Sequence, residues 1–379
     1  MSRIAMVHGS GGQATGQLID EVFAAEFRDQ TLDEMEDSAL VPGAGQLALT
    51  TDSFVVTPVR FRGGDIGRLA VCGTVNDLLM RGAVPKYLTC GWILQEGTDM
   101  ELVREMAHSM ARTAREAGIR IVAGDTKVIE GSVGGFTTRT LEGMLGPQKP
   151  ETPDIGTVSP DGSGIRTGQS ARYGETDSSL DGGILINTAG VGFVPAGRNI
   201  SAGNAQPGDA ILVSGTMGDH HAAILSERMS IKTDIRSDNA PLTEMVSNLL
   251  RCGIHVRTLR DVTRGGLGTV LKELAEASGR TFELQQNLIP VSGQVQDFCS
   301  LLGLDPVYMG NVGNLGAGVP ADEAEKAVQI MHNSKYGEHA ALIGHVTDSQ
   351  KPGTLLMRTE IGGIRLLDVL QGEGLPRIC

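Results

Sequence analysis

The chain has 379 residues, of which 40% are hydrophobic and 20% charged, as in ordinary globular proteins, and its length favours two domains over one. A net charge of -13 and an aromatic content of 3% argue against a nucleic-acid-binding surface, which needs basic and stacking side chains. The sequence lacks a run of about 18 apolar residues and the apolar core of a signal peptide, so a cytoplasmic location is expected.

Apolar periodicity predicts alternating helices and strands in the first half of the chain. Helices are expected at 13–27, 65–85 and 99–118, and strands at 47–59, 86–95, 119–126 and 183–194. The helix at 65–85 is apolar on nearly every side, which predicts that it is buried.

Residues 147–183 consist mainly of Pro, Gly, Ser, Thr and Asp. Such a segment cannot bury enough apolar surface to offset the entropy of ordering, so a disordered insertion is expected. The second half again alternates strands and helices, with a strand-turn-helix at 208–229, helices at 241–253 and 265–279, a strand-helix-strand unit at 314–346 and a hairpin at 354–370. We therefore expect an α+β protein of two domains, 1–200 and 201–370, followed by a mobile tail, 371–379.

The five cysteines are odd in number and include no CxxC pair, which argues against a disulfide framework and a structural zinc site. Cys72, Cys90 and Cys299 have apolar neighbours and are expected in the core. Cys379 is the last residue, in the stretch GEGLPRIC. It is either an incidental thiol on a frayed end or a thiol that the tail carries into a pocket, since eight extended residues reach about 26 Å.

Three aspartates fall where burial is expected: Asp52 within a strand, Asp77 in the apolar helix, and Asp125 at the end of a strand. Each alone is most simply a capping or salt-bridged residue. Three buried carboxylates together are unfavourable without a cation, so they predict a Mg²⁺ site and, through it, a nucleotide phosphate.

Two glycine-rich segments that precede helices could bind phosphate through backbone N–H groups. The first, HGSGGQATGQ, is not a P-loop and is equally well explained as a flexible lead-in, whereas the second joins Asp261 and Arg264 to two glycines. Lys127 could bind phosphate or act as a base, or it could be a surface lysine. His220 and His221 point about 100° apart on a helix, so at most one faces a pocket.

The motifs, in their order, resemble the ATP-binding superfamily of aminoimidazole ribonucleotide synthetase, selenophosphate synthetase and thiamine-phosphate kinase. The resemblance is strongest to the HypE family of hydrogenase maturation factors, the carbamoyl dehydratases. It is carried by HGSGGQAT, TTDSFVVTP, GTVNDLLMRGA, GDTKV, INTAGVG, GDHHAAIL, RDVTRGGLGTVL and the closing PRIC. The resemblance implies an N-terminal half-barrel ATP-binding domain like that of aminoimidazole ribonucleotide synthetase, a C-terminal α/β sandwich domain and a flexible tail. It also implies a homodimer in which the first-domain sheets complete a barrel.

By this resemblance, the chain uses ATP and Mg²⁺ to dehydrate a carbamoyl group on its terminal cysteine to thiocyanate, the source of the cyanide on the iron of [NiFe] hydrogenase. The carbamoyltransferase HypF and the iron-carrying HypC–HypD complex are the implied partners. The residues implied are Cys379, Lys127 and His220 for catalysis; Gly11, Gly12, Asp52, Asn76, Asp77, Asp125, Thr126, Asp261 and Arg264 for the cofactor; and Asp52, Asp77 and Asp125 for the metal.

Two features depart from the family pattern. The first is the insertion after GDTKV, at about 131–181. The second is Val312, which stands in GNVGNLG where the family typically has a glutamate implicated in dehydration. Valine cannot transfer a proton, so two alternatives stay open: a maturation scaffold without dehydratase activity, and another ATP-dependent synthetase or kinase of the superfamily, which would not need Cys379.

Overall fold

The computed structural model describes residues 3–5, 8, 13–29, 41–130, 183–348 and 351–370. The expected insertion at 147–183, apart from Gly183, and the tail with Cys379 therefore lie outside the described residues.

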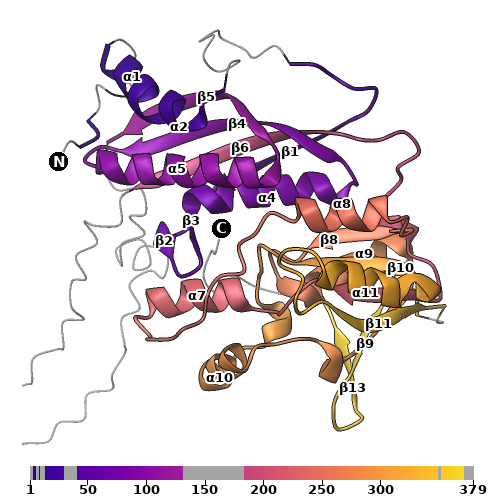
Figure 1. Cartoon of the computed structure of the whole chain (residues 1–379). Helices are drawn as coiled ribbons and strands as arrows, with labels where there is room; N and C mark the ends of the chain where they lie inside the picture. Colours follow the sequence, from indigo (N-terminus) through magenta and orange to yellow (C-terminus); the bar gives the residue numbers. More distant parts are fainter. Residues whose placement is uncertain are drawn as a thin grey trace, which may run out of the picture.

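The first half of the chain forms a four-stranded sheet with helices packed on one face (Figure 1). Its elements are α1 (Gln13–Leu18), a π-helical turn η2 (Ile19–Ala24), α2 (Ala25–Phe27), β1 (Leu47–Phe54), β2 (Arg60–Phe61), β3 (Gly64–Asp65), α4 (Ile66–Met80), β4 (Val84–Gln95), α5 (Met100–Ala117), β5 (Arg120–Ile129) and β6 (Ile184–Phe193). The strand order is β1-β6-β4-β5, with β4 and β5 parallel and the other pairs antiparallel.

The second half forms a seven-stranded sheet in the order β13-β12-β9-β11-β7-β10-β8, in which only β12 and β9 pair in parallel among the described strands. Its elements are η3 (Ala202–Asn204), β7 (Asp209–Val213), α7 (Asp219–Arg228), α8 (Thr243–Arg251), β8 (Thr258–Asp261), α9 (Gly266–Ser278), β9 (Thr281–Gln285), η4 (Gln286–Leu288), α10 (Gly293–Leu302), η5 (Pro306–Tyr308), β10 (Leu315–Pro320), η6 (Ala321–Glu323), α11 (Ala324–His332), β11 (Ala341–Thr347), β12 (Leu355–Arg358) and β13 (Ile364–Leu367).

The expected mixed fold of helices and sheets is confirmed, as are most of the expected elements. The short strands β8 and β9 and helix α10 were not predicted, because each is too brief or too polar to give a clear period. Cys72, Cys90 and Cys299 are buried as expected, and Cys252 is exposed.

Helix α4 lies at the junction of the two halves. It is buried along nearly its whole length, as its composition predicts, and Asp65 caps it by accepting a hydrogen bond from the Arg68 N–H at 2.8 Å. The largest cluster of buried apolar side chains includes α4 and residues of both sheets, so the two halves share one core.

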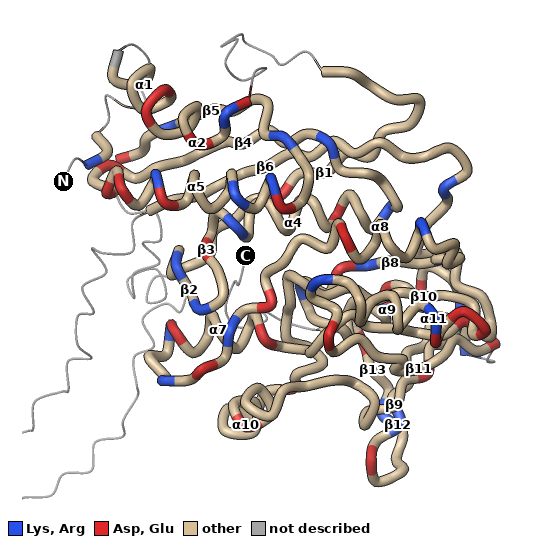
Figure 2. Tube along the Cα trace, viewed as in Figure 1, with Lys and Arg blue, Asp and Glu red and all other residues tan. Residues whose placement is uncertain are grey.

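Charged side chains of both signs are interspersed over both halves of the described chain (Figure 2). Among the described helices, none is both long and apolar enough to span a membrane.

Candidate functional site

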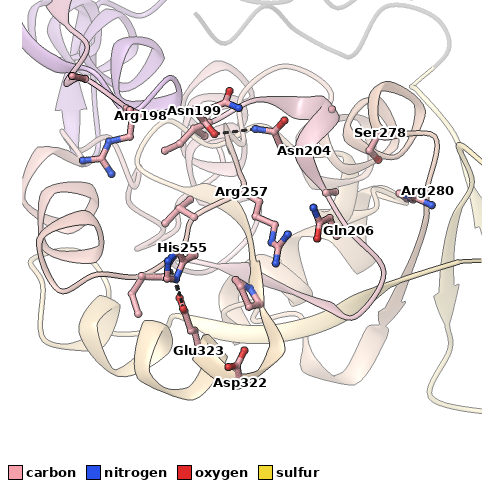
Figure 3. A pocket seen from close by; sticks show the side chains of 18 residues that line it. Arg198, Asn199, Asn204, Gln206, His255, Arg257, Ser278, Arg280, Asp322 and Glu323 are labelled. Atoms are coloured by element: carbon pink, nitrogen blue, oxygen red, sulfur yellow. Dashed lines mark hydrogen bonds and ion pairs between the residues drawn. The ribbon is translucent and has the colours of Figure 1, made fainter.

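Two large cavities are lined by residues that the structure describes, and their charges distinguish them. The larger, about 1070 Å³, lies where the segments 196–206, 254–257, 278–280 and 320–323 meet (Figure 3). Several of its charged groups have a partner of opposite sign: His255 bonds to Glu323, Arg257 lies 3.1 Å from Asp209, and Arg280 lies 2.9 Å from Asp348. These cationic groups are therefore already compensated within the chain.

The second cavity, about 850 Å³, lies between the two halves and is lined by three aspartates, Asp52, Asp77 and Asp261. Asp52 comes from β1, Asp77 from α4 and Asp261 from the end of β8. Helix α4 packs against both strands, which brings the three carboxylates to one site although they are far apart in sequence. We call these three residues the carboxylate cluster.

The pKa values of the carboxylate cluster are all raised. Burial and the charge of Asp77 raise the pKa of Asp52 to about 6, against the opposing effect of Arg264. Burial and then the charges of Asp77 and Asp52 raise the pKa of Asp261 to about 7. Burial also raises the pKa of Asp77, although Thr50 donates a hydrogen bond to its carboxylate at 2.7 Å. A cation would relieve the repulsion within the cluster.

The start of α9 faces the same cavity. Thr263, Arg264 and Gly265 line it, and Arg264 is exposed. Gly265 and Gly266 have φ of +76° and +64°, and a Cβ on Gly266 would lie 2.6 Å from the carbonyl carbon of Tyr308. The turn therefore requires glycine, and it presents backbone N–H groups and an arginine as an anion-binding helix start would.

His221, Tyr308, Gly310 and Val312 also line this cavity. The sequence analysis expected His220 as the catalytic histidine, but His220 is fully buried, with its Nδ1 2.7 Å from the Ser237 hydroxyl, and His221 lines the cavity instead. The catalytic role of His220 stays a prediction. The two side chains diverge on α7 as adjacent helical residues must.

Asp125 does not join Asp52 and Asp77 within one chain, so a single chain does not assemble the predicted metal triad, and the role of Asp125 stays a prediction. β1 and β5 are at opposite edges of the sheet, about 14 Å apart at ordinary strand spacing. Asp125 also lies on the face away from α4, where Lys127 donates to it at 2.8 Å and lowers its pKa. Asp261 occupies the place in the cluster that was expected for Asp125.

Other predicted cofactor residues also lie away from the cavity. Asn76 is fully buried, and its amide group is bonded to backbone groups of the second half rather than facing the cavity. Thr126 is buried on the helix-covered face of the sheet. Gly11, Gly12 and Cys379 lie outside the described residues, so their roles stay predictions. Conversely, Tyr308 and Glu273 line the cavity but carry no sequence signal that would have identified them.

The residues present suit a magnesium nucleotide better than a metal ion alone. Within the described ranges, no three His, Cys, Asp or Glu side chains converge closely enough to hold an ion by themselves. Mg²⁺ typically binds one or two protein carboxylates and takes its remaining ligands from water and substrate phosphates. Here the carboxylate cluster, whose pKa values are raised, could supply the protein ligands of Mg²⁺, and Arg264 and the start of α9 could bind the phosphates.

The last described residue, Leu370, also lines the cavity, and its N–H donates to the Thr269 hydroxyl at 3.1 Å. The tail, residues 371–379, therefore follows a residue at the cavity wall.

Comparisons with known proteins show the family to which the chain belongs. The family models for AIR synthase related proteins match the chain at 35–141 (N-terminal domain) and 206–356 (C-terminal domain). The chain is 42% identical to the carbamoyl dehydratase HypE of Azotobacter vinelandii over 99% of this chain and 97% of the relative. It is 39% identical to that of Escherichia coli K12 over the whole of both.

Solved structures show the same similarity. A hydrogenase maturation protein HypE in complex with ATP superposes with a TM-score of 0.82 at 39% identity, covering 99% of each chain. A HypE chain in a HypE–HypF complex gives 0.70 at 39% identity, covering 93% of this chain and 99% of that one. A thiamine-monophosphate kinase of Stenotrophomonas maltophilia shares the fold at 19% identity, with a TM-score of 0.62 over 90% of this chain and 95% of that one. The chain therefore belongs to the HypE family of carbamoyl dehydratases.

Proposed function

We propose that this chain uses ATP to dehydrate a carbamoyl group on the Cys379 thiol to a thiocyanate, the source of cyanide for the iron of [NiFe] hydrogenase. The observation that carries the proposal is Leu370 at the wall of the carboxylate-lined cavity. Nine residues follow it, and an extended chain of that length spans about 30 Å. The terminal thiol can therefore reach the cavity. Family membership and the relative solved with ATP support the same activity.

The reaction needs phosphorylation because the amide oxygen is a poor leaving group. Transfer of the γ-phosphoryl group of ATP to that oxygen releases ADP, and the oxygen then leaves with phosphate. The carbamoyl nitrogen loses two protons, and the carbon–nitrogen bond becomes the triple bond of the thiocyanate. We propose the cavity residue His221, in place of His220, for proton transfer. Lys127 lies outside this cavity within one chain and would contribute to proton transfer only across the dimer interface proposed below.

One or two carboxylates of the cluster formed by Asp52, Asp77 and Asp261 would hold Mg²⁺ together with the ATP phosphates, and Arg264 and the start of α9 would bind phosphate oxygens. When bound, Mg²⁺ offsets the phosphate charge. The chain's own contribution is to orient the nucleotide and to receive the tail between the two halves. Gly11 and Gly12 remain proposed phosphate contacts.

A homodimer fits the exposed face of the four-stranded sheet. Away from α4 and α5, this face exposes the apolar side chains Leu47, Leu49, Val84, Ile93 and Ile129, which we call the apolar sheet face. Leu49 is 71% exposed, which is unfavourable in water. Asp125 and Lys127 lie on the same face, so in the proposed dimer they would act at or across the interface.

A HypF-type carbamoyltransferase as the donor of the carbamoyl group, and a HypC–HypD complex as the acceptor of the cyanide, complete the proposal. The first is supported by the solved HypE–HypF complex of a relative. We propose the cytoplasm as the location, where these maturation steps would occur.

Val312 favours one alternative function, a maturation scaffold that carries the carbamoyl group without dehydrating it. Its apolar side chain lines the cavity where the family pattern has glutamate. In that case Cys379 would be carbamoylated, and water would not be lost.

Intact-mass spectrometry of the C-terminal peptide tests both functions. The protein is incubated with a competent carbamoyltransferase and carbamoyl phosphate, with and without ATP–Mg²⁺, alongside Cys379→Ser as the control. The proposed activity predicts an adduct on Cys379 that loses water only when ATP is present. A persistent adduct identifies the scaffold, and the absence of any adduct on the wild-type protein rejects the role of the tail.

A further inference from the structure

A buried asparagine on α4 connects the helix that carries Asp77 to the part of the cavity lining formed by Val312. The Nδ2 group of Asn76 donates to the carbonyl oxygens of Ala240 at 3.1 Å and Val312 at 2.8 Å. Its Oδ1 accepts from the N–H of Leu242 at 2.9 Å. Asn76 is fully buried and directly precedes Asp77, so the residue next to a cluster carboxylate bonds directly to the Val312 backbone.

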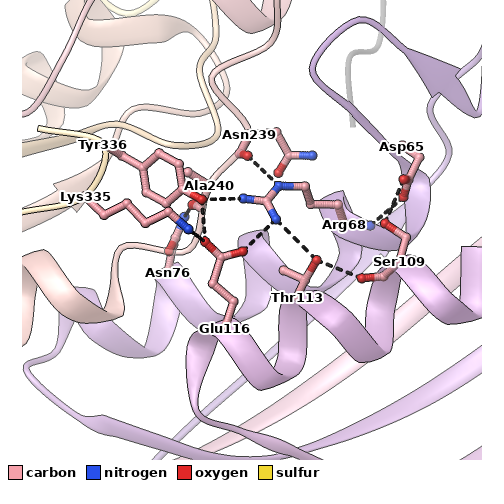
Figure 4. Close-up of polar contacts among 10 residues, drawn as sticks. All are labelled: Asp65, Arg68, Asn76, Ser109, Thr113, Glu116, Asn239, Ala240, Lys335 and Tyr336. Carbon is pink, nitrogen blue, oxygen red and sulfur yellow. Dashed lines mark hydrogen bonds and ion pairs between the residues drawn. The ribbon is translucent and has the colours of Figure 1, made fainter. Parts of the chain in front are cut away.

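Arg68 makes a second connection from the same helix, eight residues or about 12 Å earlier along its axis. Its Nε donates to the carbonyl oxygen of Asn239 at 2.8 Å, and its terminal nitrogens donate to Glu116 at 2.9 Å and to the Tyr336 hydroxyl at 3.0 Å (Figure 4). Glu116 of α5 also bonds to Lys335 and Tyr336 of the second half. The guanidinium group is thus fixed by both halves of the molecule.

Both connections end on the segment 238–242, which we call the bridging segment. Its first residue, Asp238, accepts hydrogen bonds from the N–H groups of Val312 at 3.2 Å and Gly313 at 3.0 Å, and from the side chains of Asn311 and Asn314 at 3.1 and 2.9 Å. A Cβ on Gly313 would lie 1.9 Å from the Asp238 carbonyl oxygen, so the two segments are in close contact. The bridging segment is therefore bonded to α4 on one side and to residues 311–314 on the other.

We propose that Arg68 and Asn76 are positioning residues that hold the cavity open at one fixed width. Through the bridging segment they set the distance between Asp77 on α4 and the wall at Val312. Neither Arg68 nor Asn76 is among the residues that line the cavity, so their effect is exerted through others. The inference rests on the proposed function in one respect, that this cavity receives ATP and the tail. Errors of about 1 Å in such a site are enough to reduce its activity strongly.

Hydrogen exchange of the folded protein tests the connection without any assay of activity. Asn76→Asp keeps the shape of Asn76 but replaces its two N–H donors with a carboxyl group that has at most one O–H donor, and Arg68→Met removes the guanidinium group while keeping most of the stem. Each should speed exchange in peptides covering 236–243 and 309–315 by about fivefold to tenfold, the size expected for one or two lost hydrogen bonds. Peptides covering α9 should be unchanged.

Arg115→Met is the matched control, because Arg115 is an exposed arginine on α5. Tyr336→Phe is the milder variant in case Asn76→Asp fails to fold, since Tyr336 is partly exposed and only its hydroxyl is removed. It should give a smaller increase in the same peptides. Unchanged exchange at 309–315 in Arg68→Met and Tyr336→Phe would overturn the proposal.

ATP binding provides the functional measurement. Calorimetric titration with ATP–Mg²⁺ at a temperature where every variant is folded should give an affinity at least about fivefold lower for Arg68→Met than for wild type or Arg115→Met. In turnover, the change should fall mainly on KM for ATP, with rescue by Arg68→Lys incomplete because lysine lacks the planar fork. A wild-type protein that binds no ATP would reject the proposed function but leave the exchange result valid, whereas unchanged affinity in Arg68→Met would reject the positioning role.

Discussion

Asp261 differs from the other two members of the carboxylate cluster in its burial: its side chain is buried, whereas Asp52 and Asp77 are half-buried. Burial and the neighbouring charges of Asp77 and Asp52 raise its pKa to about 7. Since the folded-state pKa is above the unfolded value, proton uptake favours the folded protein, and this stabilisation is lost as the pH rises through about 7. In cation-free buffer, the wild-type protein should therefore gain about 2 kcal/mol of unfolding free energy from this residue between about pH 8 and about pH 5.5.

Urea unfolding at the two pH values, with Asp261→Asn as the comparison, measures this contribution. The variant should lack that part of the pH dependence, because asparagine does not titrate. Mg²⁺ with ATP should stabilise the wild type most at the higher pH, where the cluster is ionised. Identical pH dependence in the two proteins would show that Asp261 does not titrate as proposed.

Val312 is the residue at which the proposed chemistry can be tested most directly. Its backbone is fixed by Asp238 and Asn76, and its side chain is 4% exposed at the cavity wall. Val312→Glu would place a carboxylate there, and if glutamate serves as a proton acceptor, loss of water from carbamoylated Cys379 should quicken by at least about tenfold.

Val312→Gln is the matched control for that experiment, because glutamine has nearly the same shape as glutamate but carries no charge. Both variants should cost about 1–3 kcal/mol of stability, since each buries a polar group in an apolar position. Equal dehydration rates in the glutamate and glutamine variants, measured by mass spectrometry, would show that position 312 has no part in proton transfer.

At the scale of elements, the start of α9 depends on one close backbone contact. Gly266 and Gly279 stand at opposite ends of this helix with the same φ of +64°. A Cβ on Gly266 would lie within 2.6–2.8 Å of backbone atoms of residues 307–309, whereas a Cβ on Gly279 would meet nothing within 4 Å. Gly279→Ala should therefore cost only the left-handed backbone strain, about 1–2 kcal/mol, and Gly266→Ala should cost more, about 3 kcal/mol or above.

Urea unfolding compares the two alanine variants, and ATP–Mg²⁺ binding by the folded proteins shows whether the phosphate-binding turn is displaced. Gly266→Ala should lose affinity and Gly279→Ala should keep it. If both substitutions reduce the free energy of unfolding by the same amount, the backbone at Tyr308 must move to accommodate the new Cβ, and its contact with Gly266 does not determine the shape of the site.

The sequence predicted long, periodic elements well and the assembly of the site only in part. Helix α4 is recognisable from its apolar composition, and Asp52 and Asp77 from being polar within apolar segments. The separation of Asp125 from Asp52 and Asp77 within one chain has a topological cause: strand order and sheet face, which put β5 at the far edge, are set by packing and are not visible in the local pattern. The hydrogen bonds of Asn76 could not be foreseen from the local pattern either, because its backbone partners come from residues about 165 to 235 positions away.

The choice between His220 and His221 could not be made from the sequence either. Adjacent helical positions differ by about 100° in direction, and which one faces the cavity depends on how α7 packs. In the structure, the ring of Phe61 packs edge-on against His220 with centroids 5.5 Å apart, and this contact with the first half keeps His220 in the interior.

At the scale of the whole molecule, each of the two large sheets is formed by a separate stretch of the chain, whereas the apolar core contains residues from both stretches. We propose two domains, 1–200 and 201–370, on the basis of the sheets. The largest apolar cluster, however, includes residues of β1, α4 and β6 together with residues of β7, α8 and β10. The halves should therefore not move independently as domains joined by a small polar interface can, and a fixed cavity between them follows from this shared core.

The apolar sheet face carries the last prediction. Leu49 is 71% exposed on an antiparallel edge strand, and the proposed homodimer would cover it. Leu49→Lys places a charge in that interface and should convert the dimer to a monomer at micromolar concentration in sedimentation velocity, with the fold intact by circular dichroism. Ile361→Lys is the control, because Ile361 is 95% exposed on the hairpin between β12 and β13, away from this face. A wild-type monomer would contradict the dimer itself, and a Leu49→Lys protein that stays dimeric would place the interface elsewhere. If the dimer dissociates and dehydration fails with it, the result would support the proposal that Lys127 and Asp125 act across the interface, since Leu49 itself lies outside the cavity.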